Sequence, residues 1–122
     1  MSETTEAEQL AQRQLEAYNA HDIVAFAACY APDIEVLSFP SNTPRFAAGI
    51  EIFRERYGSM FASFPNVHAR LVKRVVHGDK CIDEEEVTGR GEPIKAIAMY
   101  WVKGGLIRKV WFMEDRTDLP NA

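Results

Sequence analysis

The four consecutive carboxylates Asp83-Glu84-Glu85-Glu86 are the residues whose types and spacing could support chemistry. They are flanked by Cys81-Ile82 and Val87-Thr88, a setting typical of a strand and not of a solvated loop. Side chains alternate along a strand, so Asp83 and Glu85 would share one face, about 7 Å apart. Ionising one acid would raise the proton affinity of the other. In an apolar cavity such a carboxyl group becomes a general acid or base near neutral pH.

Arg74 is the cation that the pattern places beside this acidic pair. A hairpin closed on the two residues Gly78-Asp79 would place Arg74 opposite Asp83. The same register would place Val72 opposite Glu85. Arg74 would then bias which of the two acids keeps its charge.

A purely structural interpretation of the same acids stays open. Acidic runs on strands are commonly the wet outer face of a sheet, paired with cations of the neighbouring strand. Three such cations precede the acidic run: Arg70, Lys73 and Arg74. Under this interpretation Asp83 and Glu85 are fully paired and have no open volume beside them.

Helices are expected in the first half of the chain. A capping box of Thr5 and Glu8 predicts a helix that runs to about Ala20. Asp22 is the expected N-cap of a short second helix, whose apolar stripe is Ile23, Phe26, Ala27 and Tyr30 and which ends at Ala31-Pro32-Asp33. A third helix begins after Gly49 and ends at Pro65, with its apolar face formed by Phe53, Tyr57, Met60, Phe61 and Phe64.

Strands are expected around and after the third helix. A short strand over 34–39 precedes it, because apolar and polar residues alternate there before a turn rich in proline. Four more follow as an antiparallel meander joined by hairpin turns, over Val67–Val76, Cys81–Thr88, Ile94–Val102 and Leu106–Glu114. Helices first and strands after predict a segregated α+β domain whose helices cover one face of a curved sheet, with room for a hollow between the layers.

The composition limits the class of protein. The 122 residues are 47% hydrophobic, enough for one domain over 1–122 with a loose tail at about 116–122. Lys and Arg number 14 against 18 Asp and Glu, a formal net charge of -4, so binding to nucleic acid or an anionic membrane is not expected. The polar N-terminus and the lack of a long apolar run predict a cytoplasmic protein. Cys29 and Cys81 are expected to be buried thiols.

Other motifs of catalysis are missing. The sequence contains no GxSxG, P-loop, dinucleotide fingerprint or HExxH, so serine hydrolase, nucleotide triphosphatase, Rossmann and zincin functions have no support. His21, His68 and His77 stand alone at a helix cap, a strand start and a turn. No cluster has metal-ligand spacing, so no metal and no cofactor are predicted.

Several local strings, in their order, resemble the nuclear transport factor 2-like superfamily, in its SnoaL-like and ketosteroid-isomerase-like branch. They span residues 8–115 and include Ala17-Tyr18-Asn19-Ala20-His21-Asp22, Tyr30-Ala31-Pro32-Asp33, Phe64-Pro65-Asn66, Gly78-Asp79, Val87-Thr88-Gly89 and Gly105-Leu106-Ile107. The resemblance implies a cone of three helices packed into a strongly bent, mostly antiparallel sheet, with an apolar pocket and a homodimer formed through the sheet. It leaves function open, because this scaffold serves isomerases, cyclases, hydrolases and binding modules.

The isomerase pattern transfers only in part. Tyr30 and Tyr57 fall where ketosteroid isomerases keep two pocket tyrosines. The resemblance matches Ser38 to the catalytic aspartate base, and a serine cannot take a proton from carbon at neutral pH. The aspartate of the oxyanion hole falls near Ile97 or Ala98, which donate no hydrogen bond. The usual isomerase chemistry therefore lacks its residues in this chain.

The resemblance also orients the strands. It implies that Asp83, Glu85 and Val87 face the pocket, as do Ala96, Ala98 and Tyr100, and on the last strand Val110, Phe112 and Glu114. Epoxide hydrolases of the same scaffold activate a water with carboxylate and arginine together, and Arg74, Asp83 and Glu85 are similar in kind. Tyr18, Tyr57 and Tyr100 would be polar points in an apolar wall of Phe26, Phe53, Phe61 and Phe112.

The sequence therefore predicts a homodimeric α+β cone that binds a small apolar or polycyclic ligand. The leading hypothesis is an acid/base reaction of the isomerase, cyclase or hydratase type, with Asp83, Glu85 and Arg74 as catalytic residues. The expected substrate-binding residues are Tyr18, Tyr30, Ser38, Phe53, Tyr57, Phe61, Tyr100, Phe112 and Glu114. The alternative is a non-catalytic ligand-binding or association module of the same fold.

Overall fold

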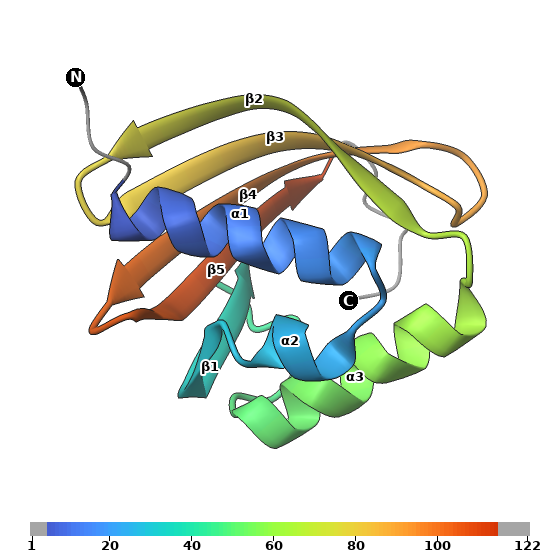
Figure 1. The fold of residues 1–122 in the computed structure, drawn as a ribbon, viewed down its shortest axis with the longest axis horizontal. Coiled ribbons are helices and arrows are strands. Elements are labelled where there is room, and N and C mark those ends of the chain that lie inside the picture. Colours follow the sequence, from blue (N-terminus) through green and yellow to red (C-terminus); the bar gives the residue numbers. More distant parts are fainter. Residues whose placement is uncertain (1–4, 115–122) are drawn as a thin grey trace.

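The computed structural model describes residues 5–114 and has the predicted α+β composition (Figure 1). The predicted tail at about 116–122 lies outside the described residues. The elements are, in chain order, α1 (Glu6–Asn19), α2 (Ile23–Ala27), β1 (Tyr30–Ser38), α3 (Ile50–Ser63), β2 (His68–His77), β3 (Lys80–Thr88), β4 (Ile94–Lys103) and β5 (Leu106–Glu114). None of the helices in the described range is long and apolar enough to cross a membrane.

The two predicted N-caps hold the first two helices. The Thr5 hydroxyl accepts from the backbone N–H of Glu8 at 3.1 Å, and the Asp22 carboxylate accepts from that of Ala25 at 3.0 Å. Each cap satisfies a donor that the first turn of a helix leaves without an intrahelical partner. The sequence therefore defines both helix starts locally.

The predicted extent of the second helix is wrong at its C-terminal end. Tyr30 belongs to β1 and not to α2, which ends at Ala27. Pro32 disfavours helical backbone at the preceding residue, and the strand starts early because Tyr30 pairs with Ile107 of β5. The Tyr30 ring still reaches the core, with its centroid 5.1 Å from that of Phe26.

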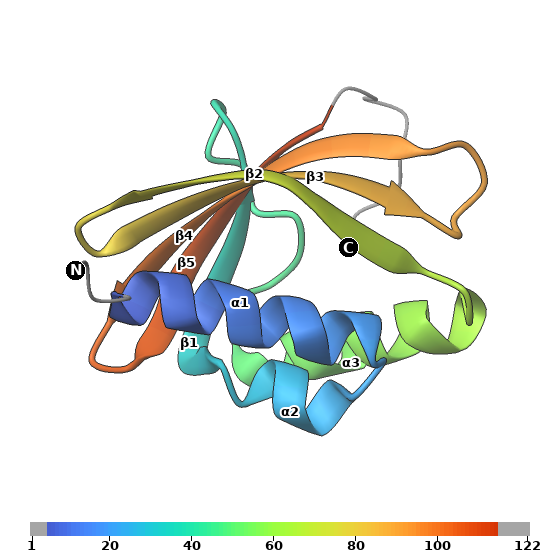
Figure 2. The same ribbon diagram turned by 45° about the horizontal axis from the view of Figure 1, so that its top comes forward.

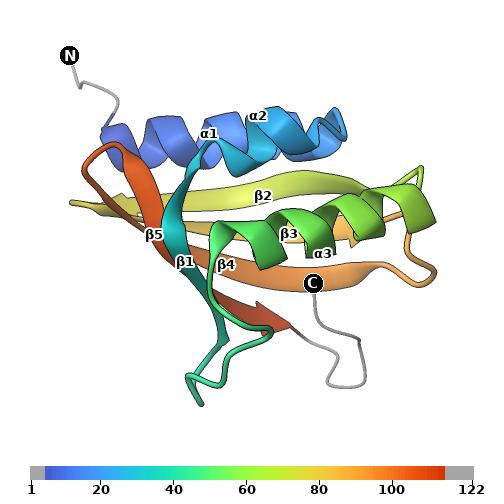
Figure 3. The same cartoon turned by 90° about the horizontal axis from the view of Figure 1, so that it is seen from below.

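One five-stranded sheet is formed in the order β1-β5-β4-β3-β2. Strands β2 to β5 are the predicted antiparallel meander, while β1 joins the edge parallel to β5. Figures 1 and 2 show the three helices on one side of this strongly twisted sheet. Helix α1 crosses β2 to β5, and α3 begins beside β1 (Figure 3).

The β2–β3 hairpin follows the predicted register over only part of its length. It turns at Gly78 and Asp79, and Arg74 lies opposite Asp83, as predicted. The prediction that Val72 lies opposite Glu85 is wrong, because a bulge between Leu71 and Lys73 puts Leu71 there instead. An extra residue in one strand reverses the facing of every side chain beyond it, and Val72 is accordingly 42% exposed.

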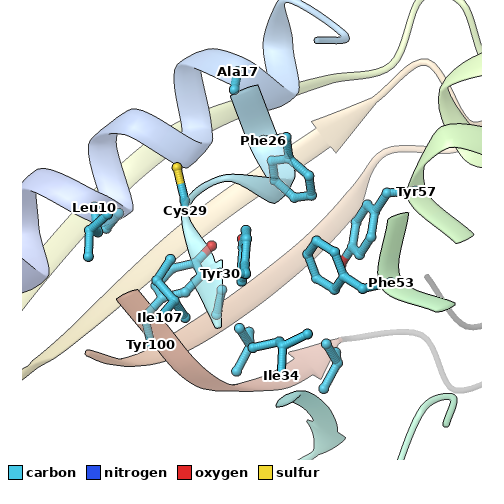
Figure 4. Packing of buried hydrophobic residues seen from close by; sticks show 14 of the residues in the cluster. Leu10, Ala17, Phe26, Cys29, Tyr30, Ile34, Phe53, Tyr57, Tyr100 and Ile107 are labelled. Carbon is cyan, nitrogen blue, oxygen red and sulfur yellow. The ribbon is translucent and has the colours of Figure 1, made fainter. Parts of the chain in front are cut away.

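Aromatic rings fill most of the space between the helices and the sheet. Phe26 lies at the centre, within 6.0 Å between ring centroids of Tyr18, Tyr30, Phe53, Tyr57 and Phe61. Figure 4 shows Phe26, Phe53 and Tyr57 packed together above β1 and β5. Cys29 and Cys81 are free and buried, as predicted. The cone is therefore largely solid, and any pocket is confined to what this packing leaves open.

Candidate functional site

The acidic run alternates across the sheet as predicted. Asp83 and Glu85 face the helices, with 0% and 7% of their surface exposed, while Glu84 is exposed and Glu86 half-buried on the other face. Carboxylates are rarely buried to this degree unless they are paired. The chemistry of each of the two inward acids therefore depends on which cations or hydrogen-bond donors offset its burial.

Asp83 is fully compensated. Arg74 binds it with two parallel hydrogen bonds, Nε to Oδ1 at 2.7 Å and Nη2 to Oδ2 at 2.9 Å. The remaining arginine nitrogen, Nη1, donates to Gln12 of α1 at 3.0 Å. The hydrogen bond to Asp83 also raises the pKa of Arg74. The Cys81 thiol also donates to Asp83 Oδ1 at 3.5 Å. This charge pair is a fixed part of the structure, and Asp83 is not among the residues that line the pocket.

Glu85 is buried without such compensation. Within the described range no side chain or backbone group hydrogen-bonds to its carboxyl group; Arg70 points to the outer face and pairs with Glu86 at 3.2 Å. Burial, and secondarily the negative charge of Asp83, raises the pKa of Glu85 to about 8, although Arg74 acts in the opposite direction. Glu85 is therefore mostly a neutral carboxylic acid at pH 7.

A pocket of about 60 Å³ opens beside this acid, between the sheet and the helices. It is lined by Tyr18, Arg45, Tyr57, Val87, Arg90, Ile94, Ala96, Phe112 and Glu114. Ala96 lies directly across the sheet from Glu85, and Val87 follows it on the same face of β3. Glu85 is therefore adjacent to two residues of the pocket wall, although it is not itself a lining residue. This volume accommodates a few water molecules or a small reacting group.

Two tyrosines place hydroxyl groups in the pocket wall. Burial raises the pKa of Tyr18 and of Tyr57 well above the usual range, so both are hydrogen-bond donors at neutral pH. The negative charge of Glu85 contributes to both shifts, which places its carboxyl group within electrostatic reach of the two phenols. Neither hydroxyl is hydrogen-bonded to another residue of the described chain, so both can bind a ligand oxygen.

Two arginines and Glu114 bring charge to the pocket. Arg45 forms an ion pair with Glu114 at 2.6 Å and lies over the Phe112 ring, 5.3 Å from its centroid. Arg90 lies over the Phe64 ring, 5.0 Å from its centroid. The apolar residues between these charged groups come mainly from β3, β4 and β5.

Residues 11–110 match the model of the SnoaL-like domain family. The chain belongs to the SnoaL-like family. No curated protein matches the sequence. The described fold is that of the nuclear transport factor 2-like and cystatin-fold proteins, with the helices packed on one face of a curled sheet.

Solved structures with this SnoaL-like fold come from several bacteria. An uncharacterized cystatin fold protein from Novosphingobium aromaticivorans is 23% identical, with a TM-score of 0.80 over 91% of this chain and 99% of its own. A protein named putative ketosteroid isomerase from Kribbella flavida is 15% identical, with a TM-score of 0.77 over 96% and 83%. A protein named putative polyketide cyclase from Sinorhizobium meliloti is 20% identical, with a TM-score of 0.74 over 86% and 94%. At these identities the likeness concerns the fold.

Four of the predicted substrate-binding residues line the pocket: Tyr18, Tyr57, Phe112 and Glu114. Four others are packed in the core and are not in its wall: Tyr30, Phe53, Phe61 and Tyr100. The Tyr30 hydroxyl donates to Gln14 of α1 at 3.0 Å. Ser38, at the end of β1, lies opposite Phe112 but outside the pocket wall.

Arg45 and Arg90 are pocket residues that the sequence did not indicate. Both lie in irregular segments, Arg45 after the proline-rich turn and Arg90 between Gly89 and Gly91. Side-chain alternation, which identified the acids, says nothing about direction in such loops. Within the described part of the SnoaL-like chain, no group of His, Cys, Asp and Glu is arranged to hold a metal ion.

Proposed function

We propose that this protein is an acid/base enzyme of the isomerase or cyclase type that acts on a small carbonyl compound, with Glu85 as the residue that moves the proton. The observation that carries the proposal is a single carboxyl group, buried beside a pocket, with a pKa of about 8 and no hydrogen bond from the described residues. A proton shuttle works best when its pKa lies near the working pH.

The proposed reaction is proton transfer at the carbon next to a carbonyl group. Ionised Glu85 takes a proton from that carbon, and the electron pair moves onto the carbonyl oxygen to form an enolate. The hydroxyls of Tyr18 and Tyr57 donate hydrogen bonds to this oxygen and stabilise its charge. Protonated Glu85 then returns the proton at the same or a conjugated carbon, so atoms and charge balance over the cycle.

Asp83 and Arg74 are positioning residues in this proposal. Their paired charges are held by three hydrogen bonds and do not face the pocket. The negative charge of Asp83 disfavours a second charge on Glu85, while Arg74 limits that effect. The pair therefore sets the proton affinity of Glu85. The volume of the pocket favours a small ligand over a polycyclic one.

Exchange of carbon-bound hydrogen for deuterium tests the proposal without knowledge of the natural substrate. The protein is incubated in D₂O with small ketones and oxo acids, including 2-butanone and 4-oxopentanoate, and deuterium next to the carbonyl is followed by NMR. We expect Glu85→Gln to reduce the protein-catalysed rate by at least about 100-fold, the usual contribution of general acid/base catalysis.

Glu84→Gln is the matched control, because Glu84 is the neighbouring acid on the exposed face. It should leave the exchange rate unchanged. Equal rates for wild type and Glu85→Gln, or no exchange by wild type above the buffer rate, would contradict the proposal. They would favour the alternative, a non-catalytic ligand-binding module.

We also propose a homodimer formed through the face of the sheet that carries no helix. Apolar side chains lie on this face in two adjacent rows, where Ile97 pairs with Met113 and Met99 with Trp111. A Met99→Glu substitution at the centre of the face should convert the dimer to a monomer, because it would bury an unpaired charge. Analytical ultracentrifugation measures the result, and a monomeric wild type would refute the dimer.

A further inference from the structure

Arg90 is a cation in the pocket wall to which the proposed reaction assigns no role. It lies in the turn between β3 and β4, and its side chain contacts the ring of Phe64. Within residues 5–114, no carboxylate forms an ion pair with it and no acceptor hydrogen-bonds to it. Its positive charge lowers the pKa of the Tyr18 hydroxyl, although burial has the larger effect and raises it. Arg90 is thus directed toward the pocket.

The backbone that carries Arg90 packs against Asn66 and Val67, the two residues before β2. Gly89 has a φ of +89°, a conformation that residues with a side chain rarely adopt. A Cβ atom at this position would lie 2.3 Å from the carbonyl oxygen of Asn66, so the two segments pack backbone to backbone. With the Phe64 ring beneath its guanidinium, Arg90 is held at the pocket and does not extend freely into solvent.

The charges of the described residues around the pocket do not cancel. Arg45 and Glu114 neutralise each other in their ion pair. Glu85 is mostly uncharged at pH 7, because burial and Asp83 raise its pKa to about 8. Among the lining residues within 5–114, Arg90 therefore leaves one positive charge, although the whole chain has a formal net charge of -4. A local positive charge on an acidic protein favours an anionic ligand.

We propose that the pocket binds a small organic acid, whose carboxylate pairs with Arg90 while its carbonyl oxygen approaches Tyr18 and Tyr57 and the carbon next to the carbonyl approaches Glu85. This inference rests on the proposed function, since it assigns the substrate class of the same pocket. The guanidinium presents two parallel N–H groups that match a planar carboxylate. Val87, Ile94, Ala96 and Phe112 would enclose the short apolar body of the acid between its two polar ends.

A monocarboxylate fits better than a phosphate ester. The pocket offers one positive charge that no described group neutralises, whereas protein phosphate sites combine several cations or a row of backbone N–H groups. Its volume of about 60 Å³ also suits a ligand of few atoms. The combination of a carboxylate and a carbonyl group identifies the class as small oxo acids.

Paired titrations of acids and their primary amides test this inference. Butanoate, hexanoate, benzoate and 4-oxopentanoate are each compared with the amide of nearly the same shape, by chemical-shift titration of the full ¹⁵N-labelled protein at pH 7. We expect acids to bind the pocket residues with a Kd about tenfold lower than their amides, as for a charge-assisted hydrogen-bonded pair. Arg90→Gln should abolish this preference, and Arg90→Lys should keep part of it.

Arg70→Gln is the matched control, because it removes the same charge from an exposed arginine on β2. It should keep the preference for acids. The inference is overturned if acids and amides bind wild type equally, if the preference survives in Arg90→Gln, or if no acid perturbs the pocket residues.

These outcomes separate the ligand class from the chemistry. A preference for acids that depends on Arg90, combined with hydrogen exchange that does not depend on Glu85, would reject the proposed reaction and keep the ligand class. Exchange that depends on Glu85, combined with equal binding of acids and amides, would do the reverse.

Discussion

An Arg74→Met substitution is expected to lower the free energy of unfolding by about 3–5 kcal/mol, the cost of leaving one member of a buried ion pair alone. Asp83 would lose both of its charged hydrogen bonds while fully enclosed, beside Glu85. Asp83→Asn should cost less. The freed Arg74 borders a surface groove of about 400 Å³ that Glu8 and Glu16 also line, so its charge can be solvated there.

Urea unfolding at pH 7 measures this asymmetry, and two further variants control it. Arg70→Met removes an exposed arginine whose partner Glu86 is 3.2 Å away, and should cost less than about 1 kcal/mol. The double variant Arg74→Met/Asp83→Leu should recover much of the lost stability, because it removes both buried charges. If Arg74→Met costs no more than Arg70→Met, the pair does not hold the charge of Asp83 as described.

Local sequence signals predicted the parts of the fold that depend on neighbouring residues. The caps at Thr5 and Asp22 and the turn at Gly78 are set by a few adjacent residues, and all three are confirmed. Alternation along β3 was enough to place Asp83 and Glu85 on the buried face. The pairing of β1 with β5 joins segments about 75 residues apart, and no local pattern encodes it.

The state of Glu85 depends on a feature that the sequence did not reveal. Without the bulge at Val72, Arg70 would face inward, within reach of Glu85, and the structural interpretation would hold for both acids. The bulge turns Arg70 to the outer face, where it pairs with Glu86, and leaves Leu71 opposite Glu85. The paired state predicted under that interpretation is therefore found for Asp83 and not for Glu85. One extra residue in β2 thus explains why Asp83 is in a charged pair while Glu85 is a neutral acid.

The free energy of unfolding is expected to fall by about 3–5 kcal/mol as the pH rises from about 4.5 to about 8, through Glu85 alone. The pKa of this group is raised in the folded state above its usual value. Between those two pH values the folded protein therefore holds a proton that the unfolded chain has released. Raising the pH within this window consequently favours unfolding. Below this window the stabilisation is fully present, and above it none remains.

The difference between wild type and Glu85→Gln isolates this effect from other titrating groups, because glutamine mimics the neutral acid and does not ionise. Urea unfolding from pH 5 to pH 9 should show similar stability for the two proteins at pH 5. At pH 9 the variant should be the more stable. Glu84→Gln should follow wild type throughout, since its side chain is solvated.

In an Asp83→Asn background the pH window of destabilisation should begin at the same pH but end at a lower pH, because the charge that opposes ionisation of Glu85 is gone. Parallel curves for wild type and Glu85→Gln would mean that Glu85 is ionised in the folded protein, and then neither its role as a proton shuttle at neutral pH nor the net positive charge of the pocket would stand.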